Sequence, residues 1–212
     1  MTLIIYDHET HRVYADRHRH HVGESRPGRV NKLIVPKSGD RMKFKAEDTG
    51  RREKVLVTSG TGNTYNFGHA HWLMQNKDMT PEQVIAHFNQ FLAGNAKGQK
   101  HSKALVFTDK RIHELQFLSG KVVTYEYGER RLFWGGGAAA AVVLDGVFKL
   151  TPMEIFRAVS KASGDRVSAD FTVVQGLPDK KGDHDILLHA TAPWPDDIAQ
   201  YEIETPVYFR DL

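Results

Sequence analysis

Cysteine is absent from the 212-residue sequence. Its absence excludes disulfides, thiolate zinc sites and a cysteine nucleophile. Long apolar runs are missing too, and the N-terminal one already ends at Asp7. A secretory signal needs a longer apolar segment, and a membrane-spanning helix needs about 20 apolar residues. We therefore expect a cytoplasmic protein that is not inserted in a membrane.

A strong charge bias is also absent. The sequence has 29 basic and 26 acidic residues, for a formal net charge of +3. Basic residues cluster at 17–31 and 97–103, but neither cluster contains an aromatic residue. A protein that binds single-stranded nucleic acid usually interleaves stacking aromatic side chains with the charge. We expect these clusters to be solvated loops or subunit contacts, with no nucleic-acid partner.

No repeat, low-complexity tract or linker divides the chain, so we expect residues 1–212 to form one domain. Runs of β-branched and aromatic residues predict strands, and apolar periodicity with cap residues predicts helices. The predicted strands are 2–6, 12–16, 32–36, 41–47, 53–58, 103–108, 111–118, 121–127, 168–175, 185–191 and 199–208. The predicted helices are 66–77, 80–92, a small-residue helix within 134–146 and one from 151. Segregated runs of strands and helices favour an α+β fold.

Local signals support three of these boundaries. Thr80 and Thr151 are predicted N-caps, each followed by a proline at the first helical position. The segment 59–63 is glycine-rich and predicts a turn that contains Gly60. Residues 37–54 are predicted to form an inserted hairpin before that turn.

Several of these residues together resemble the proteasome β-subunit family, including the bacterial proteasome-like peptidases of the N-terminal-nucleophile hydrolases. Thr2 begins the first strand, and residues 13–17 read Val-Tyr-Ala-Asp-Arg. Lys32 opens the third predicted strand, and Gly135–Gly137 precede a helix. The resemblance implies a four-layer αββα sandwich, a polypeptide substrate, a homo-oligomeric ring and an ATP-dependent unfoldase as partner.

The resemblance also implies a threonine peptidase. Thr2 would be the nucleophile after removal of Met1, because a free α-amine can act as its base. The positive charge of Lys32 would favour the alkoxide, and Asp16 would orient Lys32. Backbone N–H groups of Gly60, Gly136 and Gly137 are the expected donors to the oxyanion.

Two departures from the family pattern stand out. Gly136 occupies the place of a serine, and Ser160 the place of an aspartate, whereas Ser163 matches the pattern and is a further expected catalytic residue. The missing groups would weaken catalysis. The alternative function is therefore a catalytically inactive structural or assembly subunit of the same fold.

A metal site is a second alternative, since the sequence has 12 histidines. Histidine and aspartate side chains suit zinc and related ions. The clusters are at 18–21, 69–71 and 183–185, and none has helical i, i+4 histidine spacing with an adjacent acid. We expect no metal site and no cofactor.

Overall fold

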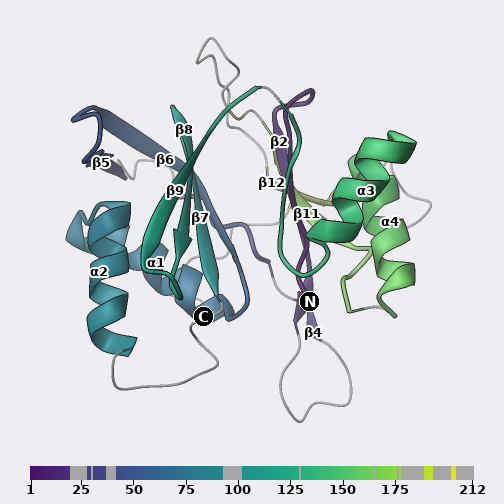
Figure 1. Cartoon of the computed structure of the whole chain (residues 1–212), viewed down its shortest axis with the longest axis horizontal. Helices are drawn as coiled ribbons and strands as arrows, with labels where there is room; N and C mark the ends of the chain where they lie inside the picture. Colours follow the sequence, from purple (N-terminus) through teal and green to yellow (C-terminus); the bar gives the residue numbers. More distant parts are fainter. Residues whose placement is uncertain are drawn as a thin grey trace.

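Two antiparallel sheets form the centre of the protein in a computed structural model (Figure 1). The structure describes residues 1–19, 28–29, 31–36, 42–92, 102–128, 130–164, 166–175, 177, 189–192 and 202–203. In spatial order, the first sheet contains β10 (Leu132–Trp134), β1 (Ile4–Asp7), β2 (Arg12–Asp16), β11 (Phe171–Gln175), β12 (His189–Ala192) and β13 (Glu202–Ile203). The second contains β5 (Lys43–Lys45), β6 (Arg52–Thr61), β7 (Lys103–Thr108), β8 (Arg111–Gln116) and β9 (Lys121–Glu126). A short ribbon pairs β3 (His18–Arg19) with β4 (Gly28–Arg29).

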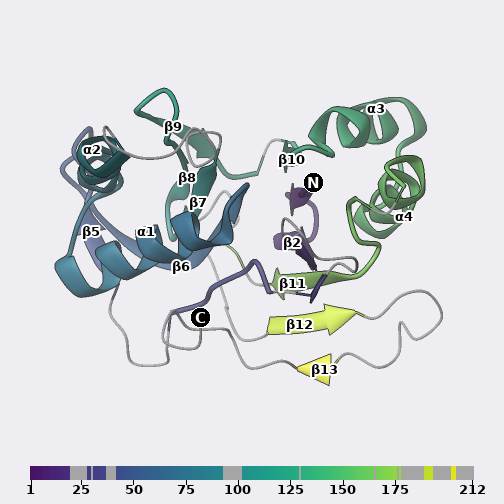
Figure 2. The ribbon, with the colours of Figure 1, turned by 90° about the horizontal axis from the view of Figure 1, so that it is seen from below.

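The helices lie outside the two sheets, one pair on each side (Figures 1 and 2). Helices α1 (Thr64–Lys77) and α2 (Pro81–Leu92) contact strands of the second sheet. Helices α3 (Ala138–Phe148) and α4 (Pro152–Ala162) cover the first sheet. The described helices thus flank the sheets instead of alternating with strands along one parallel sheet.

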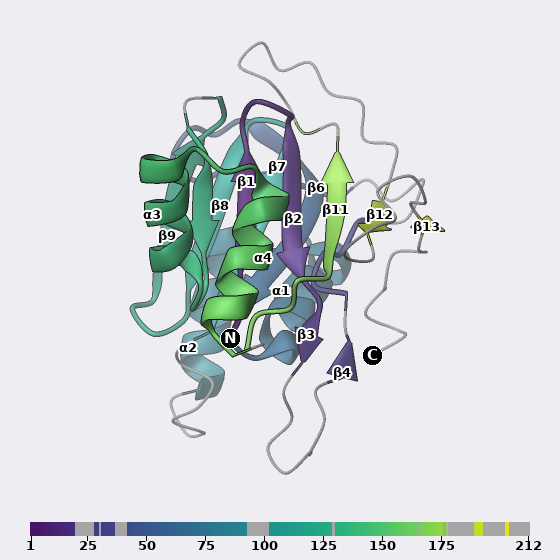
Figure 3. The same ribbon diagram turned by 90° about the vertical axis from the view of Figure 1, so that its right-hand side faces the viewer.

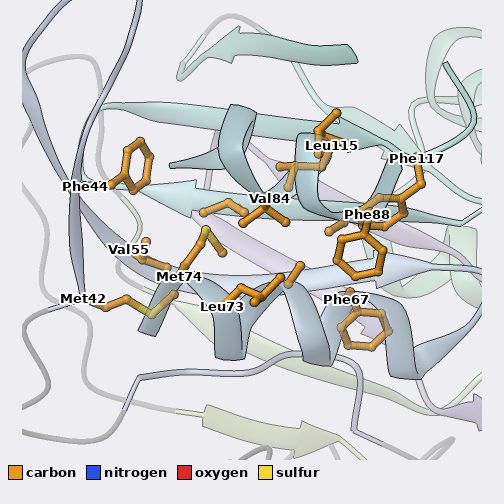
Figure 4. Close-up of a cluster of buried hydrophobic side chains, with 14 of the residues drawn as sticks. Met42, Phe44, Val55, Phe67, Leu73, Met74, Val84, Phe88, Leu115 and Phe117 are labelled. Carbon is orange, nitrogen blue, oxygen red and sulfur yellow. The ribbon is translucent and has the colours of Figure 1, made fainter. Parts of the chain in front are cut away.

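Strand alternation supplies three separate hydrophobic cores. In β1, Ile4 and Tyr6 join the core between the sheets, whereas Ile5 joins the core beneath α3 and α4. This is the two-residue period of side chains along a strand. Figure 4 shows the third core, where α1 and α2 pack on the second sheet through side chains such as Leu73 and Phe88.

A buried carboxylate connects the two sheets. Glu114 on β8 accepts a hydrogen bond from the indole Nε1 of Trp134 on β10, at 2.8 Å. The same carboxylate accepts from Tyr125 at 2.7 Å and from Lys103 at 2.6 Å. Together with the Gln116 amide, which donates at 2.8 Å, these donors offset the cost of removing the carboxylate from water. Trp134 immediately precedes the glycines at the start of α3, so the contact helps to place that segment.

The expectation of a fold that mixes helices with strands in separate runs is confirmed, and the two large sheets are antiparallel. Helix α2 begins at Pro81 after Thr80, and α4 begins at Pro152 after Thr151, as predicted. Thr151 forms a full capping box with Glu154. These ends are well predicted because the cap residues act within one turn.

Other predicted boundaries are wrong. Residues 32–36 form no strand, and only Ile34 makes an isolated bridge, to Thr58. The side chain of Asn31 accepts the Leu33 N–H at 3.0 Å, so a side chain replaces a strand partner there. Strand β6 continues through Gly60, and the turn starts only at Gly62, whose φ is +86°.

The predicted hairpin at 37–54 is described in part. Strand β5 pairs with β6 in antiparallel register, from Lys43 opposite Lys54 to Lys45 opposite Arg52. Residues 37–41 lie outside the described residues. Whether the hairpin is an insertion, and whether 1–212 is a single domain, stay predictions. The predicted strands at 185–191 and 199–208 also lie largely outside the described residues. Strand β12 overlaps the first and ends one residue beyond it, and β13 lies within the second.

None of the helices in the described part of the chain is long and apolar enough to cross a membrane.

Truncation of Phe88 tests the core between α2 and the second sheet. The Phe88 ring is 2% exposed and its centroid lies 4.5 Å from that of Phe117. We expect Phe88→Ala to lower the free energy of unfolding by about 3–5 kcal/mol, because it leaves a cavity in the core. Urea denaturation followed by circular dichroism measures the change. The exposed residue Gln90 on the same helix is the control, and equal effects of Phe88→Ala and Gln90→Ala would contradict this packing.

Candidate active site

Thr2 lies two residues before β1 and contacts the connection between β10 and α3. The carbonyl oxygen of Thr2 accepts a hydrogen bond from the Gly137 N–H, at 3.2 Å. Gly135 has φ +98°, and a Cβ atom there would lie 2.2 Å from the Thr2 carbonyl oxygen. Only glycine permits this approach, because an L-residue would be strained and would collide. The glycine segment therefore holds the backbone of Thr2.

Asp16, at the end of β2, is tied to the residue that follows Thr2. The Asp16 N–H donates to the Leu3 carbonyl oxygen at 3.0 Å. The Leu3 N–H in turn donates to Asp16 Oδ1 at 2.9 Å. Pairing of β1 with β2, with Ile4 opposite Ala15, sets up both contacts. These contacts place the fully buried carboxylate of Asp16 next to the first residues of the chain.

Lys32 completes the cluster. Its Nζ lies 2.9 Å from Asp16 Oδ1 and 3.2 Å from Thr2 Oγ1, within hydrogen-bond distance of both. Lys32 is 3% exposed, Thr2 8% and Asp16 0%. Three residues that are separated in sequence thus meet in a buried cluster, as the resemblance predicted. Their catalytic roles stay a prediction.

The backbone around Lys32 is held by β6. The Ser59 hydroxyl donates to the Lys32 carbonyl oxygen at 2.7 Å. Two residues further along, Ile34 exchanges both backbone hydrogen bonds with Thr58 at 2.8 Å. These contacts fix the direction of the Lys32 side chain without making its segment a strand.

Burial lowers the pKa of Lys32 from its ordinary value, and the charge and hydrogen bond of Asp16 oppose that shift. Desolvation disfavours the charged amine, whereas the neighbouring carboxylate favours it. Asp16 therefore sustains the positive charge on Lys32 beside the Thr2 hydroxyl.

The terminal amine experiences the same surroundings. Burial lowers the pKa of the Met1 ammonium, and the charges of Lys32 and Arg166 lower it further, whereas Asp16 raises it. Met1 itself is 45% exposed, whereas Thr2 is 8% exposed. An amine on Thr2 would lie in a more buried position than the amine of Met1, and desolvation favours its neutral form.

The three glycines predicted as oxyanion donors lie in different surroundings. Gly136 lies under the Met1 side chain, since a Cβ there would be 3.0 Å from the Met1 Cγ. The Gly137 N–H already donates to Thr2. Gly60 lies within β6, where a Cβ would be 2.5 Å from the Lys103 carbonyl oxygen, so close packing explains this glycine. Their roles as oxyanion donors stay predictions.

Ser163 caps the end of α4. Its hydroxyl donates to the Ser160 carbonyl oxygen at 3.1 Å and accepts from the Val167 N–H at 3.2 Å. Ser163 also lines a pocket of about 590 Å³ together with Met1, Gly136, Gly137, Gly164 and Arg166. Figure 3 shows the N-terminus beside the end of α4. The structure therefore brings Ser163 to the N-terminal region through this pocket.

Sequence patterns did not indicate Arg166 or Ser59, and they indicated Gly135 only as part of the glycine-rich start of a helix. Arg166 is exposed and follows Ser163 by three residues, and no motif distinguishes it from other surface arginines. The contact of Ser59 with Lys32 crosses from one segment to another. Only the glycine-rich stretch carried a local signal, because a positive φ favours glycine.

No group of three or more histidine, aspartate or glutamate side chains within the described part of the chain is arranged to hold a metal ion. In the cluster at 69–71, the His69 ring stacks on Trp72 with centroids 5.7 Å apart, and His71 Nδ1 lies 3.0 Å from Thr58 Oγ1. The cluster at 183–185 lies outside the described residues, as do His20 and His21.

Comparison with solved structures identifies a proteasome-related fold. The chain is similar to Anbu from Hyphomicrobium sp. strain MC1, with a TM-score of 0.58 and 11% identity over 100% of this chain and 91% of that chain. It is also similar to Anbu (ancestral beta-subunit) from Yersinia bercovieri, with a TM-score of 0.52 and 11% identity over 82% of this chain and 80% of that one. No protein-family model matches the chain, and no curated protein sequence matches it.

These comparisons correct the family predicted from the sequence. The structural neighbours are Anbu proteins, which are proteasome-like but distinct from the predicted family. An identity of 11% shows the fold alone. Assignment to the proteasome β-subunit and bacterial proteasome-like peptidase family is therefore wrong. The short motifs that suggested it follow the fold, because the pairing of β1 with β2 and the contacts of the Lys32 segment with β6 bring residues 2, 16 and 32 together.

A double-mutant cycle tests the buried pair of Asp16 and Lys32. We expect Asp16→Asn and Lys32→Met each to lower the free energy of unfolding by about 3–5 kcal/mol, because each leaves one buried charge without its partner. The double variant should lose clearly less than the sum of the two. Urea denaturation measures all three.

The control for this cycle is Lys110→Met, since Lys110 is 55% exposed and lies 3.5 Å from Asp109. An exposed ion pair contributes about 0–1 kcal/mol. Additive losses in the double variant would show that Asp16 and Lys32 are not coupled, contrary to the geometry described above.

Proposed function

We propose that the protein is a threonine-type peptidase whose nucleophile is Thr2 after removal of Met1. The observation that carries the proposal is the buried contact of Lys32 Nζ with Thr2 Oγ1 at 3.2 Å, with Asp16 Oδ1 at 2.9 Å on the same amine. A cation so placed lowers the cost of forming an alkoxide. The proposed substrate is a polypeptide.

The base in this mechanism is the α-amine of Thr2. While Met1 is attached, the Thr2 nitrogen is an amide and cannot accept a proton. Once it is free, the amine takes the proton from Oγ1 as Oγ1 attacks the carbonyl carbon of the scissile peptide bond. The proton then passes to the leaving amine as the C–N bond breaks, which leaves an ester on Thr2. Water hydrolyses the ester and regenerates the hydroxyl.

Lys32 and Asp16 act through charge and orientation. Lys32 donates toward Oγ1, and Asp16 holds Lys32 in its protonated form. The tetrahedral intermediate also needs donors for its oxyanion. Because the Gly137 N–H is engaged by Thr2, we assign this role first to Gly136, which lies beside the N-terminus.

We further propose a four-layer αββα sandwich and assembly into a homo-oligomeric ring, with an ATP-dependent unfoldase as partner. The three hydrophobic cores support the layers, since each sheet has helices on one face and the other sheet opposite. The likeness to Anbu structures supports a proteasome-related subunit.

A noncatalytic structural or assembly subunit is the competing function. The observation that favours it is the lack of two supporting side chains, since Gly136 stands where the family pattern has a serine and Ser160 where it has an aspartate. In this reading Met1 is retained and the Thr2 nitrogen never becomes a base.

Kinetic comparison of variants that begin at residue 2 tests the peptidase. We expect Thr2→Ala to abolish hydrolysis of fluorogenic peptides and Thr2→Ser to retain it, because serine keeps the hydroxyl and the amine. Lys32→Met should lower kcat/KM by about 10²–10³-fold, the usual effect of losing one electrostatic stabiliser. Thr10→Ala, at an exposed turn position outside the cluster, is the control. Hydrolysis by Thr2→Ala at the parental rate would overturn the proposal.

The pH dependence tests the assigned base and cation. We expect kcat/KM to rise with pH through the pKa of the Thr2 amine, with a midpoint below the usual value of about 7.7–8.0 for an α-amine. The reason is that burial, Lys32 and Arg166 lower the pKa of the neighbouring Met1 amine. At higher pH activity should fall as Lys32 loses its proton, because burial lowers its pKa from 10.5. A profile without an acid limb would exclude the amine as the base.

A further inference from the structure

The pocket at the end of α4 has room for a substrate group near the start of the chain. Its volume is about 590 Å³, and small residues form much of its wall, among them Gly136, Gly137 and Gly164. Met1 lines it as well, with its side chain against Gly136. Removal of Met1 would therefore extend this space next to the proposed nucleophile.

The charge on the described side chains that line this pocket is positive. Arg166 is the only charged side chain among the described lining residues. It forms no ion pair within the described part of the chain, and it is exposed. The charge of Arg166 also acts on the N-terminus. It lowers the pKa of the Met1 ammonium, by less than burial and Lys32 do.

The carboxylate of Asp16 does not neutralise the charge of Arg166. Asp16 is fully buried and already accepts from Lys32 and from the Leu3 N–H. Among the described residues that line the pocket, no acid competes with an incoming group for Arg166. A guanidinium presents a planar set of donors that matches a carboxylate in a bidentate fashion.

We propose that this pocket is a substrate subsite for a carboxylate, and that Arg166 is its specificity-determining residue. The inference rests on the proposed function, because it names the substrate class of the same site. The carboxylate comes either from an acidic side chain close to the scissile bond or from the C-terminus of the substrate. A cationic side chain in that position is repelled by Arg166 and Lys32.

The position of Met1 links this subsite to processing. In the chain that retains Met1, its side chain lies along the pocket wall at Gly136. Removal of Met1 thus exposes the amine of Thr2 and clears the subsite in one step. A chain that keeps Met1 should bind acidic peptides more weakly than one that begins at Thr2.

Matched peptides test the subsite. The probes are internally quenched peptides with Glu or Gln at each position flanking the scissile bond, each made with a free and an amidated C-terminus. With protein that begins at Thr2, we expect kcat/KM to favour a carboxylate over its amide by about 10-fold, the scale of one charge-assisted hydrogen bond. A preference for Glu identifies the side chain as the source, and a preference for the free C-terminus identifies the terminus.

Substitution of Arg166 should remove the preference. Arg166→Gln is expected to bring the carboxylate-to-amide ratio to about 1, and Arg166→Lys to retain part of it, because lysine keeps the charge but loses the bidentate geometry. Lys161→Gln, which removes an exposed charge from the last turn of α4 outside the pocket, should leave the ratio unchanged. An unchanged ratio in Arg166→Gln, or a ratio near 1 in the parent, would overturn the subsite.

Binding measurements separate this inference from the proposed function. The same peptides, labelled with a fluorophore, are titrated with the Thr2→Ala variant that begins at residue 2, and anisotropy is recorded. Tighter binding of carboxylate peptides that depends on Arg166, together with no hydrolysis by the parent, supports the subsite and contradicts the peptidase. Hydrolysis by the parent without any preference contradicts the subsite alone.

Discussion

The buried ion pair of Asp16 and Lys32 is the constraint on which the N-terminal region depends. Asp16 accepts from Lys32 and from the backbone of Leu3, so one carboxylate connects the start of the chain, the end of β2 and the segment beside β6. Such a pair costs desolvation and gives little net stability compared with apolar packing. Because the intact pair adds little net stability, we attribute it to function: Asp16 keeps the Lys32 ammonium next to Thr2 Oγ1.

The two sheets make this arrangement possible. Thr2 precedes β1 and Asp16 ends β2, both strands of the first sheet, whereas the Lys32 segment is held by Ser59 and Thr58 on the second. The core between the sheets therefore sets the distance from Lys32 to Thr2. The hydrogen bond from Trp134 to Glu114 crosses the same interface. It helps to place the glycine segment that follows Trp134 and contacts the Thr2 backbone. A polar cluster at the end of a sheet-on-sheet core gains rigidity from the packing around it.

Sequence patterns predicted the parts of this structure that depend on local chemistry. The caps at Thr80 and Thr151 act within one turn of their helices, and the structure confirms them. The meeting of Thr2, Asp16 and Lys32 was predicted by resemblance, and the hydrogen bonds bring these residues together. The family inferred from the same residues was wrong, because short motifs follow a fold that diverse sequences share.

Contacts between segments that are far apart in the sequence could not be predicted from sequence patterns. Arg166 enters the pocket because α4 ends beside the N-terminus, and no periodicity in the sequence records that proximity. The strand predicted at 32–36 failed for a related reason: Asn31 and Ser59 satisfy backbone groups that a neighbouring strand would otherwise pair. Gly60 looked like a turn residue, yet it is a glycine because Phe67 and the Lys103 carbonyl leave no room for a side chain.

Intact-mass analysis with N-terminal sequencing, before and after treatment with a β-lactone, tests catalysis by Thr2. We expect a species that begins at Thr2 and gains one inhibitor mass, with the adduct on the Thr2 peptide and none on Thr2→Ala. A chain that retains Met1 and gains no adduct would contradict catalysis by Thr2, and the protein would then be a noncatalytic subunit of the same fold.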